Sequence, residues 1–307
     1  MSTRARDLTP AAVDIAALEP LQTIRSRWPT LIGAALSIAM VFGLGHELLG
    51  AGLAGLRRSV PADPAFYVAF TLFYLGPPFF DFVIFRRLWG IPASGFAALL
   101  KKRIANDVVL NYSGEAYFYA WARANAPMVA APFGAVKDVS ILSAVAGNAI
   151  TLGMVAIALP LARELLTPDQ FRTVLGSAGL ALVASLPFLL FSRRVFSLPR
   201  PDLWWVFGVH CLRLVLGSIF VALAWHFAMP SVTIGMWLLL AAGRLLVSRL
   251  PLVPNKDLIF ANIAILMIGQ DRALSELIAF VAAATLLTHV ALIVAFGAWA
   301  LARRRAA

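Results

Sequence analysis

One polar stretch of this chain carries side chains that could bind a polar ligand. It reads LNYSGEAYFYAWARANAP over residues 110–127 and combines amide, hydroxyl, carboxylate and guanidinium groups. A surface facing hydrocarbon does not tolerate such groups, so the stretch lies either outside the apolar layer or enclosed by helices. Its small and aromatic residues favour enclosure. The candidate binding residues in it are Asn111, Ser113, Glu115 and Arg123.

A second pattern occurs twice: a proline, four residues, Lys-Asp and an aliphatic residue. It reads PFGAVKDV at 132–139 and PLVPNKDL at 251–258. One interpretation is helix capping by the aspartates, with the lysines reaching lipid phosphates. The other is that two helix N-termini face one polar cavity, where dipole and lysine bind an anion. The residues concerned are Lys137, Asp138, Asn255, Lys256 and Asp257, with Arg249 just before the second copy.

An acidic residue, Asp81, lies inside an apolar run directly after Gly76-Pro77-Pro78. Because proline lacks a backbone donor, the pair of prolines predicts a break or kink in this helix. A carboxylate beside a kink is a candidate for a gate or a proton-transfer group. The alternative is a structural partner for an arginine.

Arg213 lies well inside another apolar run and shares a helix face with His210, three residues before it. A charge at this depth needs a partner. We therefore expect Arg213 to face the interior of the bundle and to pair with Glu115 or Asp138.

The sequence shows no pattern for a metal or a cofactor. No His, Cys or carboxylate group has metal-ligand spacing, and there is no Gly-rich phosphate loop or Gly-x-Ser-x-Gly turn. We therefore expect no catalytic residue, no metal and no cofactor. Cys211 is the only cysteine, which excludes an intrachain disulfide.

The composition is that of a membrane protein. Of 307 residues, 61% are hydrophobic and only 13% are charged, whereas soluble domains are about half apolar and about a quarter charged. The net charge of +11 would suggest nucleic acid in a soluble protein. Here the basic residues flank apolar runs, which is typical of topology signals and contact with anionic lipid. We therefore exclude nucleic acid as a partner.

The apolar runs predict an all-α polytopic membrane protein with seven or eight transmembrane helices. A spanning helix needs about 20 apolar residues, and six runs meet that length. A seventh run contains Arg244, and an eighth would rise only about 18 Å, which is typical of a re-entrant helix. In chain order the runs are Leu31–Leu49, Phe66–Phe85, Val139–Leu161, Val174–Phe191, Trp204–Phe227, Val232–Val247, Leu258–Gly269 and Ile278–Leu301.

Basic residues predict the orientation. They gather in the N-terminal segment, after the second and fourth spans, and at the C-terminal end, so we expect the inner (plasma) membrane with both termini in the cytoplasm. The segment Ser94–Ile104, SGFAALLKKRI, predicts an amphipathic helix at the cytoplasmic interface with its lysines among lipid headgroups.

The expected organisation is a single membrane domain between two short ends. Residues 1–29 form a cytoplasmic tail, 30–302 the transmembrane domain and 303–307 a basic end. The repeated Lys-Asp pattern suggests a parallel internal repeat with halves 30–192 and 203–302, the first carrying the polar insert 94–125.

Two patches resemble the flippase-like transmembrane region of the lysylphosphatidylglycerol synthase superfamily. In that family an asparagine and a Gly-Glu precede a helix with an arginine, matched here by Asn111, Gly114, Glu115 and Arg123. A proline-marked polar break precedes the penultimate helix, matched by Pro251, Pro254, Asn255 and Asp257. The chain ends soon after its last apolar run, so we expect a stand-alone form without the aminoacyltransferase domain. The resemblance implies lipid handling.

From these observations we expect binding and translocation of an anionic phospholipid or lipid-linked headgroup through a polar intramembrane cavity. Membrane lipids would be the partners. Two alternatives stay open. One is an integral membrane transferase acting on a lipid-linked substrate, with Glu115 or Asp257 as base. The other is a non-catalytic assembly partner in a larger membrane complex.

Overall fold

The computed structural model describes residues 60–108, 113–125, 132–165, 196–249 and 271–306, with a few single positions between them. Throughout these residues the regular secondary structure is helical, without strands. Four helices are long and apolar enough to cross a membrane. This agrees with the predicted all-α class and indicates a membrane location.

Helix α2 (Pro64–Trp89) continues without a break through the two prolines at which a break or kink was predicted. Pro78 has no backbone N–H, so the carbonyl of Tyr74, four residues earlier, lacks its helical donor. The guanidinium of Arg103, on the next helix, donates to that carbonyl instead. The helix therefore continues, because a neighbouring side chain supplies the missing hydrogen bond.

Helix α3 (Ser94–Val108) runs antiparallel to α2. Near the start of α3 the Phe96 ring packs edge-on against Phe82, and further along α3 Arg103 contacts Tyr74. Later residues of α3 therefore contact earlier residues of α2. With 15 residues it rises only about 22 Å, less than the hydrocarbon thickness of about 30 Å.

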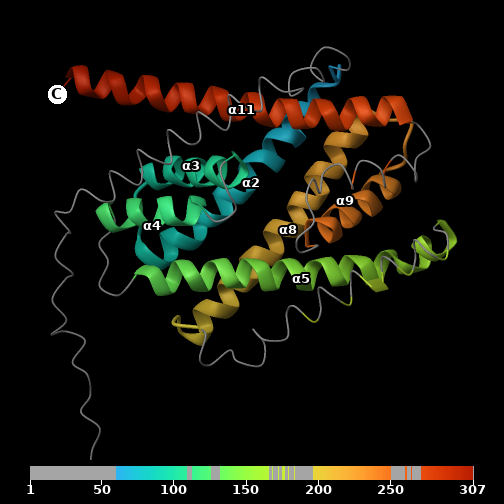
Figure 1. Ribbon diagram of the computed structural model, residues 1–307, viewed down its shortest axis with the longest axis horizontal. Helices are drawn as coiled ribbons and strands as arrows, with labels where there is room; N and C mark the ends of the chain where they lie inside the picture. The colour runs from blue at the N-terminus through green and yellow to red at the C-terminus, as the bar shows by residue number, and fades with distance from the viewer. Residues whose placement is uncertain are drawn as a thin grey trace, which may run out of the picture.

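Helix α4 (Ser113–Asn125) lies beside α3 and returns towards the end of α2 (Figure 1). The Phe118 ring packs against Phe85, at 4.6 Å between centroids, and against Trp89. Helices α3 and α4 thus pack antiparallel as a short helical hairpin. Such backbone is tolerated at membrane depth where protein encloses it or where it lines a cavity.

The buried side chains of α4 agree with the predicted enclosure of the 110–127 stretch over residues 113–125, which the structure describes, and the position of α3 corrects the predicted interfacial position of Ser94–Ile104. The helix forms, but its two lysines do not both extend to headgroups. Lys102 is 9% exposed and lies inside the bundle. The Lys101 ammonium lies 5.0 Å from the ring centre of Phe296. Interior carboxylates, described below, account for the burial of Lys102.

Helix α8 (Arg200–Ala228) is the central element. It packs against α2, against α5 (Pro132–Leu165) and against α9 (Ile234–Arg249) (Figure 1). Helices α2 and α8 are antiparallel, since Arg87 near the end of α2 pairs with Asp202 in the first turn of α8 at 3.6 Å.

Helix α11 (Asp271–Ala306) lies along the side of α2 and α3, away from α5 (Figure 1). The Phe280 ring contacts Phe66 at 5.6 Å between centroids. Further along, Leu292 packs against Ile104 of α3.

Two apolar clusters form the core. One joins α2, α8, α9 and α11 around Tyr74 and Trp225. The other joins the end of α2, the hairpin and the starts of α5 and α8, around Phe85, Phe118 and Val206. Between these clusters α2 carries Asp81, and α8 carries His210 and Arg213.

Four predicted runs coincide with the helices of spanning length, and the seventh run forms a shorter apolar helix, Ile234–Ser248. The run Leu31–Leu49 lies outside the described residues. The runs Val174–Phe191 and Leu258–Gly269 are described only at single positions. The total of seven or eight is therefore not confirmed. The spanning helices are Pro64–Trp89, Gly134–Met154, Arg200–Ala228 and Glu276–Ala302.

Candidate functional site

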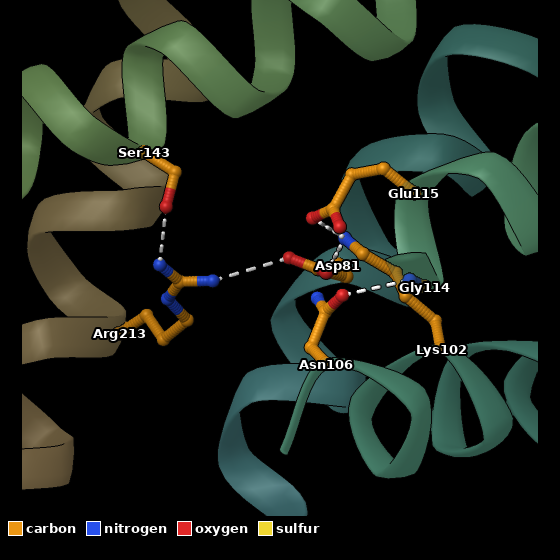
Figure 2. Close-up of polar contacts among 7 residues, drawn as sticks. All are labelled: Asp81, Lys102, Asn106, Gly114, Glu115, Ser143 and Arg213. Carbon is orange, nitrogen blue, oxygen red and sulfur yellow. Dashed lines mark hydrogen bonds and ion pairs between the residues drawn. The ribbon is translucent and has the colours of Figure 1, made fainter. Parts of the chain in front are cut away.

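Asp81 is the centre of a buried ionic cluster between the two apolar clusters. One carboxylate oxygen accepts a hydrogen bond from the Lys102 ammonium at 2.7 Å, and the other faces an Arg213 guanidinium nitrogen at 3.2 Å. Figure 2 shows Asp81 between Arg213 on one side and Lys102 with Glu115 on the other. Helices α2, α3 and α8 meet through this one carboxylate.

Lys102 is held by a second carboxylate as well. Its ammonium lies 3.4 Å from one oxygen of Glu115, the third residue of α4. Two carboxylates, those of Asp81 and Glu115, therefore face this one ammonium. Lys102 is therefore a charged group inside the bundle. The other oxygen of Glu115 is buried and has no hydrogen-bond partner among the described residues.

Arg213 links the cluster to α5. Besides Asp81, its guanidinium donates a hydrogen bond to the Ser143 hydroxyl at 2.8 Å. Arg213 was expected to pair with Glu115 or Asp138, and this expectation is wrong: its carboxylate partner is Asp81.

The hairpin positions Glu115 by an unusually close approach. The Gly114 backbone N–H donates to the Asn106 side-chain oxygen at 2.7 Å, and the Ser113 hydroxyl donates to the carbonyl of Ala105. A Cβ on Gly114 would lie 2.1 Å from the backbone oxygen of Lys102. Only glycine therefore fits here, and it sets Glu115 beside Lys102.

A second branch of the cluster leads from α3 to α11. The Arg103 guanidinium covers the ring of Tyr74 at 4.3 Å and lies 3.5 Å from the Asp107 carboxylate. The same carboxylate lies 3.5 Å from a ring nitrogen of His289 on α11. Asp107 therefore connects the hairpin to the last helix.

These side chains surround a cavity of about 310 Å³. Its walls come from α2, α3, α4, α5 and α8, with Pro77, Ser140 and His210 among them. The charged residues of its wall are three cations and three carboxylates: Lys102, Arg103, Arg213, Asp81, Asp107 and Glu115.

The cavity lies well inside the length of α2 and α8, two helices long and apolar enough to cross a membrane. Asp81 precedes the end of α2 at Trp89 by eight residues, or about 12 Å of helix, and Arg213 follows the start of α8 at Arg200 by thirteen, or about 20 Å. These two helix ends lie together, and the hydrocarbon core is about 30 Å thick. A charged group at such depth is commonly part of a binding site or pathway.

Of the residues singled out in the sequence, the structure brings Asp81, Glu115 and Arg213 together. Within the described part of the chain, Ser113, Arg123 and Lys137 do not line the cavity. The Arg123 guanidinium instead donates to the Tyr119 hydroxyl one turn earlier, at 3.2 Å.

Asp138 has a structural role different from the predicted helix cap. Helix α5 begins at Pro132, so Asp138 lies inside the helix rather than at its cap. Its carboxylate is fully buried and accepts hydrogen bonds from the backbone N–H groups of Ser197 and Leu198, at 2.6 and 2.7 Å. The Lys137 ammonium lies 3.4 Å from it. Asp138 thus holds the segment before α8 against α5.

The remaining predicted site residues have side chains that the structure does not describe. Asn111 and the second Lys-Asp copy lie outside the described residues, as does the side chain of Arg249 at the end of α9. Convergence of the two Lys-Asp copies on one cavity therefore stays a prediction. The second copy comprises Asn255, Lys256 and Asp257.

Sequence reasoning missed Lys102, Asn106 and Ser143 as parts of the site. A usable signal existed for the first two: Lys102 and Asn106 are four residues apart and so share one helix face, as do Arg103 and Asp107. Both pairs are polar, and polar side chains on a helix inside an apolar bundle need hydrogen-bond or ionic partners. Ser143 carries no such signal.

In coarse terms, the fold and site define an all-helical protein with helices of membrane-spanning length and a charged internal cavity. No family model, no curated protein and no solved structure matches the chain.

Proposed function

We propose that this protein binds the headgroup of an anionic phospholipid in the cavity and moves it across the membrane. The observation that carries the proposal is the cavity itself, whose wall holds three cations together with three carboxylates between helices of membrane-spanning length. Moving a phosphate through hydrocarbon without compensating groups is prohibitively costly. A polar cavity whose wall supplies ammonium and guanidinium groups would lower that cost.

The size of the cavity fits a headgroup rather than a whole lipid. At about 310 Å³ it is at the small end of ligand sites, which range from about 300 to about 1,000 Å³. The acyl chains would stay in the bilayer while the headgroup enters. Exposed apolar side chains on α2 and α8, such as Leu72 and Leu212, suit contact with lipid chains.

Two residues have the chemistry to bind the phosphate. Arg213 carries a guanidinium, which binds phosphate oxygens in a bidentate manner, and Lys102 carries a compact ammonium. They are joined only by Asp81 and face the same cavity. A phosphate could therefore contact both.

The resemblance to the lysylphosphatidylglycerol synthase transmembrane region supports the same function. Its Gly-Glu pair corresponds to Gly114 and Glu115, at the tip of the helical hairpin. In this proposal the glycine permits the tight hairpin and the glutamate faces the cavity.

We place the protein in the inner membrane with both termini in the cytoplasm. Arg86, Arg87 and Arg200 lie at the end where α2 stops, the hairpin enters and α8 starts. Basic residues at one end of several helices favour the cytoplasmic side. The hairpin would then enter from the cytoplasm.

The test is leaflet exchange in liposomes. The purified full chain is reconstituted with fluorescent phosphatidylglycerol, and exchange is followed by dithionite quenching for wild type, Lys102→Met and Arg213→Gln. Loss of one charge-assisted contact, about 1.5–3 kcal/mol, should slow exchange by about tenfold or more. Arg87→Gln is the matched control because this arginine is in an exposed ion pair, with a side chain 49% exposed.

Each alternative has its own outcome in this experiment. No exchange by folded wild-type protein would overturn the proposal. Lipid conversion detected by mass spectrometry would favour the transferase, with Glu115 as base. Inert liposomes together with co-purifying membrane proteins would favour the assembly partner. Including Lys137→Ala and Lys256→Ala tests whether the Lys-Asp copies also hold the headgroup.

A further inference from the structure

We propose that entry of the headgroup phosphate is coupled to uptake of one proton by Glu115, so that phosphate and proton occupy the cavity together. This inference rests on the proposed function. It supplies a source of energy for transport that the function by itself leaves open.

The first step is that the cavity's cations already have anionic partners. Lys102 is shared by Asp81 and Glu115, Arg213 pairs with Asp81, and Arg103 pairs with Asp107. The walls balance three positive charges with three negative ones. The formal charges of the cavity wall therefore cancel, and each of its three cations already faces a carboxylate.

A phosphate can bind such a cavity only by replacing a carboxylate as the partner of a cation. The site would then carry one excess negative charge, and the displaced carboxylate would lie near the phosphate. Two like charges in a buried site disfavour ionisation of one of them. Protonation of a carboxylate removes both problems and restores a neutral cavity.

Glu115 is the carboxylate most easily displaced. Among the described residues its ionic contact is to Lys102 at 3.4 Å, whereas Asp81 holds Lys102 at 2.7 Å and Arg213 as well. Its second oxygen is buried without a hydrogen-bond partner among the described residues, so it can take a proton without losing a contact there. Its side chain is 18% exposed, twice the exposure of Asp81, which gives water a route to it.

Asp107 is a poorer candidate. Its side chain is 44% exposed and faces both Arg103 and His289, so it remains solvated and paired when the cavity is filled. Binding of an anion deeper inside does not require Asp107 to lose its charge.

The groups around Glu115 agree with this assignment. They come from three helices: Asp81 from α2, three charged residues from α3, and two basic side chains from α8. The cavity residues of α5 carry no charge. The only cation in direct contact with Glu115 among the described residues is Lys102. The set is Asp81, Lys102, Arg103, Asp107, His210 and Arg213.

The exchange can be written with its charges balanced. A proton from water adds to the free oxygen of Glu115, and the Glu115–Lys102 ion pair ends. The Lys102 ammonium then binds a phosphate oxygen, while Asp81 keeps its contact with Arg213. Release of the lipid reverses both changes, and the proton returns to water. One negative and one positive charge move together, so the step is electroneutral.

The experiment measures binding of short-chain phosphatidylglycerol to the purified full chain between about pH 5.5 and about pH 8. Because one proton is taken up with each lipid, the dissociation constant should rise with pH, by up to about tenfold per pH unit. In weakly buffered solution a pH dye should report about one proton taken up per lipid bound.

Glu115→Gln supplies the decisive variant. Glutamine imitates the neutral side chain, so the variant should bind the lipid at every pH and take up no proton. Asp202→Asn is the matched control, since this carboxylate is in the exposed pair with Arg87, outside the cavity. It should keep the pH dependence of the wild type.

The outcomes separate the two proposals. Binding that is independent of pH, without proton uptake, would overturn the coupling and leave lipid binding in place. Loss of the pH dependence in Asp81→Asn but not in Glu115→Gln would overturn the assignment to Glu115. Absence of lipid binding at any pH would overturn the proposed function itself. If Glu115→Gln does not fold, proton uptake by the wild type decides.

Discussion

Replacing Asp81 with asparagine should destabilise the protein more than any other single loss of charge in the described part of the chain. The substitution keeps the shape of the side chain and removes the charge that faces Lys102 and Arg213. At an effective dielectric constant of about 20, the two ion pairs at 2.7 and 3.2 Å correspond to about 6 and about 5 kcal/mol of attraction.

Desolvation offsets much of that attraction. Breaking a buried pair by removing one partner typically costs about 3–5 kcal/mol, because an uncompensated charge remains. Asparagine still offers an oxygen to the Lys102 ammonium, and Glu115 remains nearby. We therefore expect a loss of about 3 kcal/mol in the free energy of unfolding.

The assay is equilibrium unfolding of the detergent-solubilised protein, followed by circular dichroism. Asp202→Asn breaks the exposed pair with Arg87, and exposed pairs contribute about 0–1 kcal/mol, so this control should change little. The double variant Asp81→Asn, Lys102→Gln removes one charge of each sign and should recover part of the loss. Equal stability of Asp81→Asn and Asp202→Asn would refute a stabilising buried cluster.

Two further predictions concern the elements that position the cluster. Gly114→Ala places a Cβ against the Lys102 carbonyl and should cost about 1–3 kcal/mol of unfolding free energy. The control Gly153→Ala meets open space and should be neutral or slightly stabilising. Similar losses of stability in both variants would contradict the tight hairpin. Asp138→Ala leaves two backbone N–H groups without their charged acceptor, at about 1.5–3 kcal/mol each, and Asp138→Asn should lose less. Hydrogen exchange at Leu198 should accelerate in Asp138→Ala, and unchanged exchange there would show that the segment is held by other contacts.

Local patterns were sufficient to predict the helices. Length and hydropathy identified the spans that became α2, α5, α8 and α11, because a long apolar run has few other stable arrangements in a membrane. Enclosure of the 110–127 stretch also followed from the cost of polar groups in lipid. Arg213 was expected to face inward for the same reason, and it does.

The partners of the charged residues could not be predicted in the same way. Arg213 was assigned to Glu115 or Asp138, and its partner Asp81 lies 132 residues away in the sequence. Asp138 was interpreted as a helix cap, although α5 starts six residues earlier. Which carboxylate meets which cation depends on how helices stack, and no short pattern encodes that.

The sequence by itself determined which segments are apolar helices and that the polar insert needs shelter, because transfer between water and hydrocarbon acts on each residue wherever it lies. The tertiary structure alone decided that Lys102 points into the bundle while its neighbour Lys101 rests near Phe296. It also decided that Arg103 completes the hydrogen bond that Pro78 removes from α2. These outcomes depend on groups that are far apart in the sequence. Which orientation of a side chain is most stable depends on the neighbours that the tertiary structure places around it.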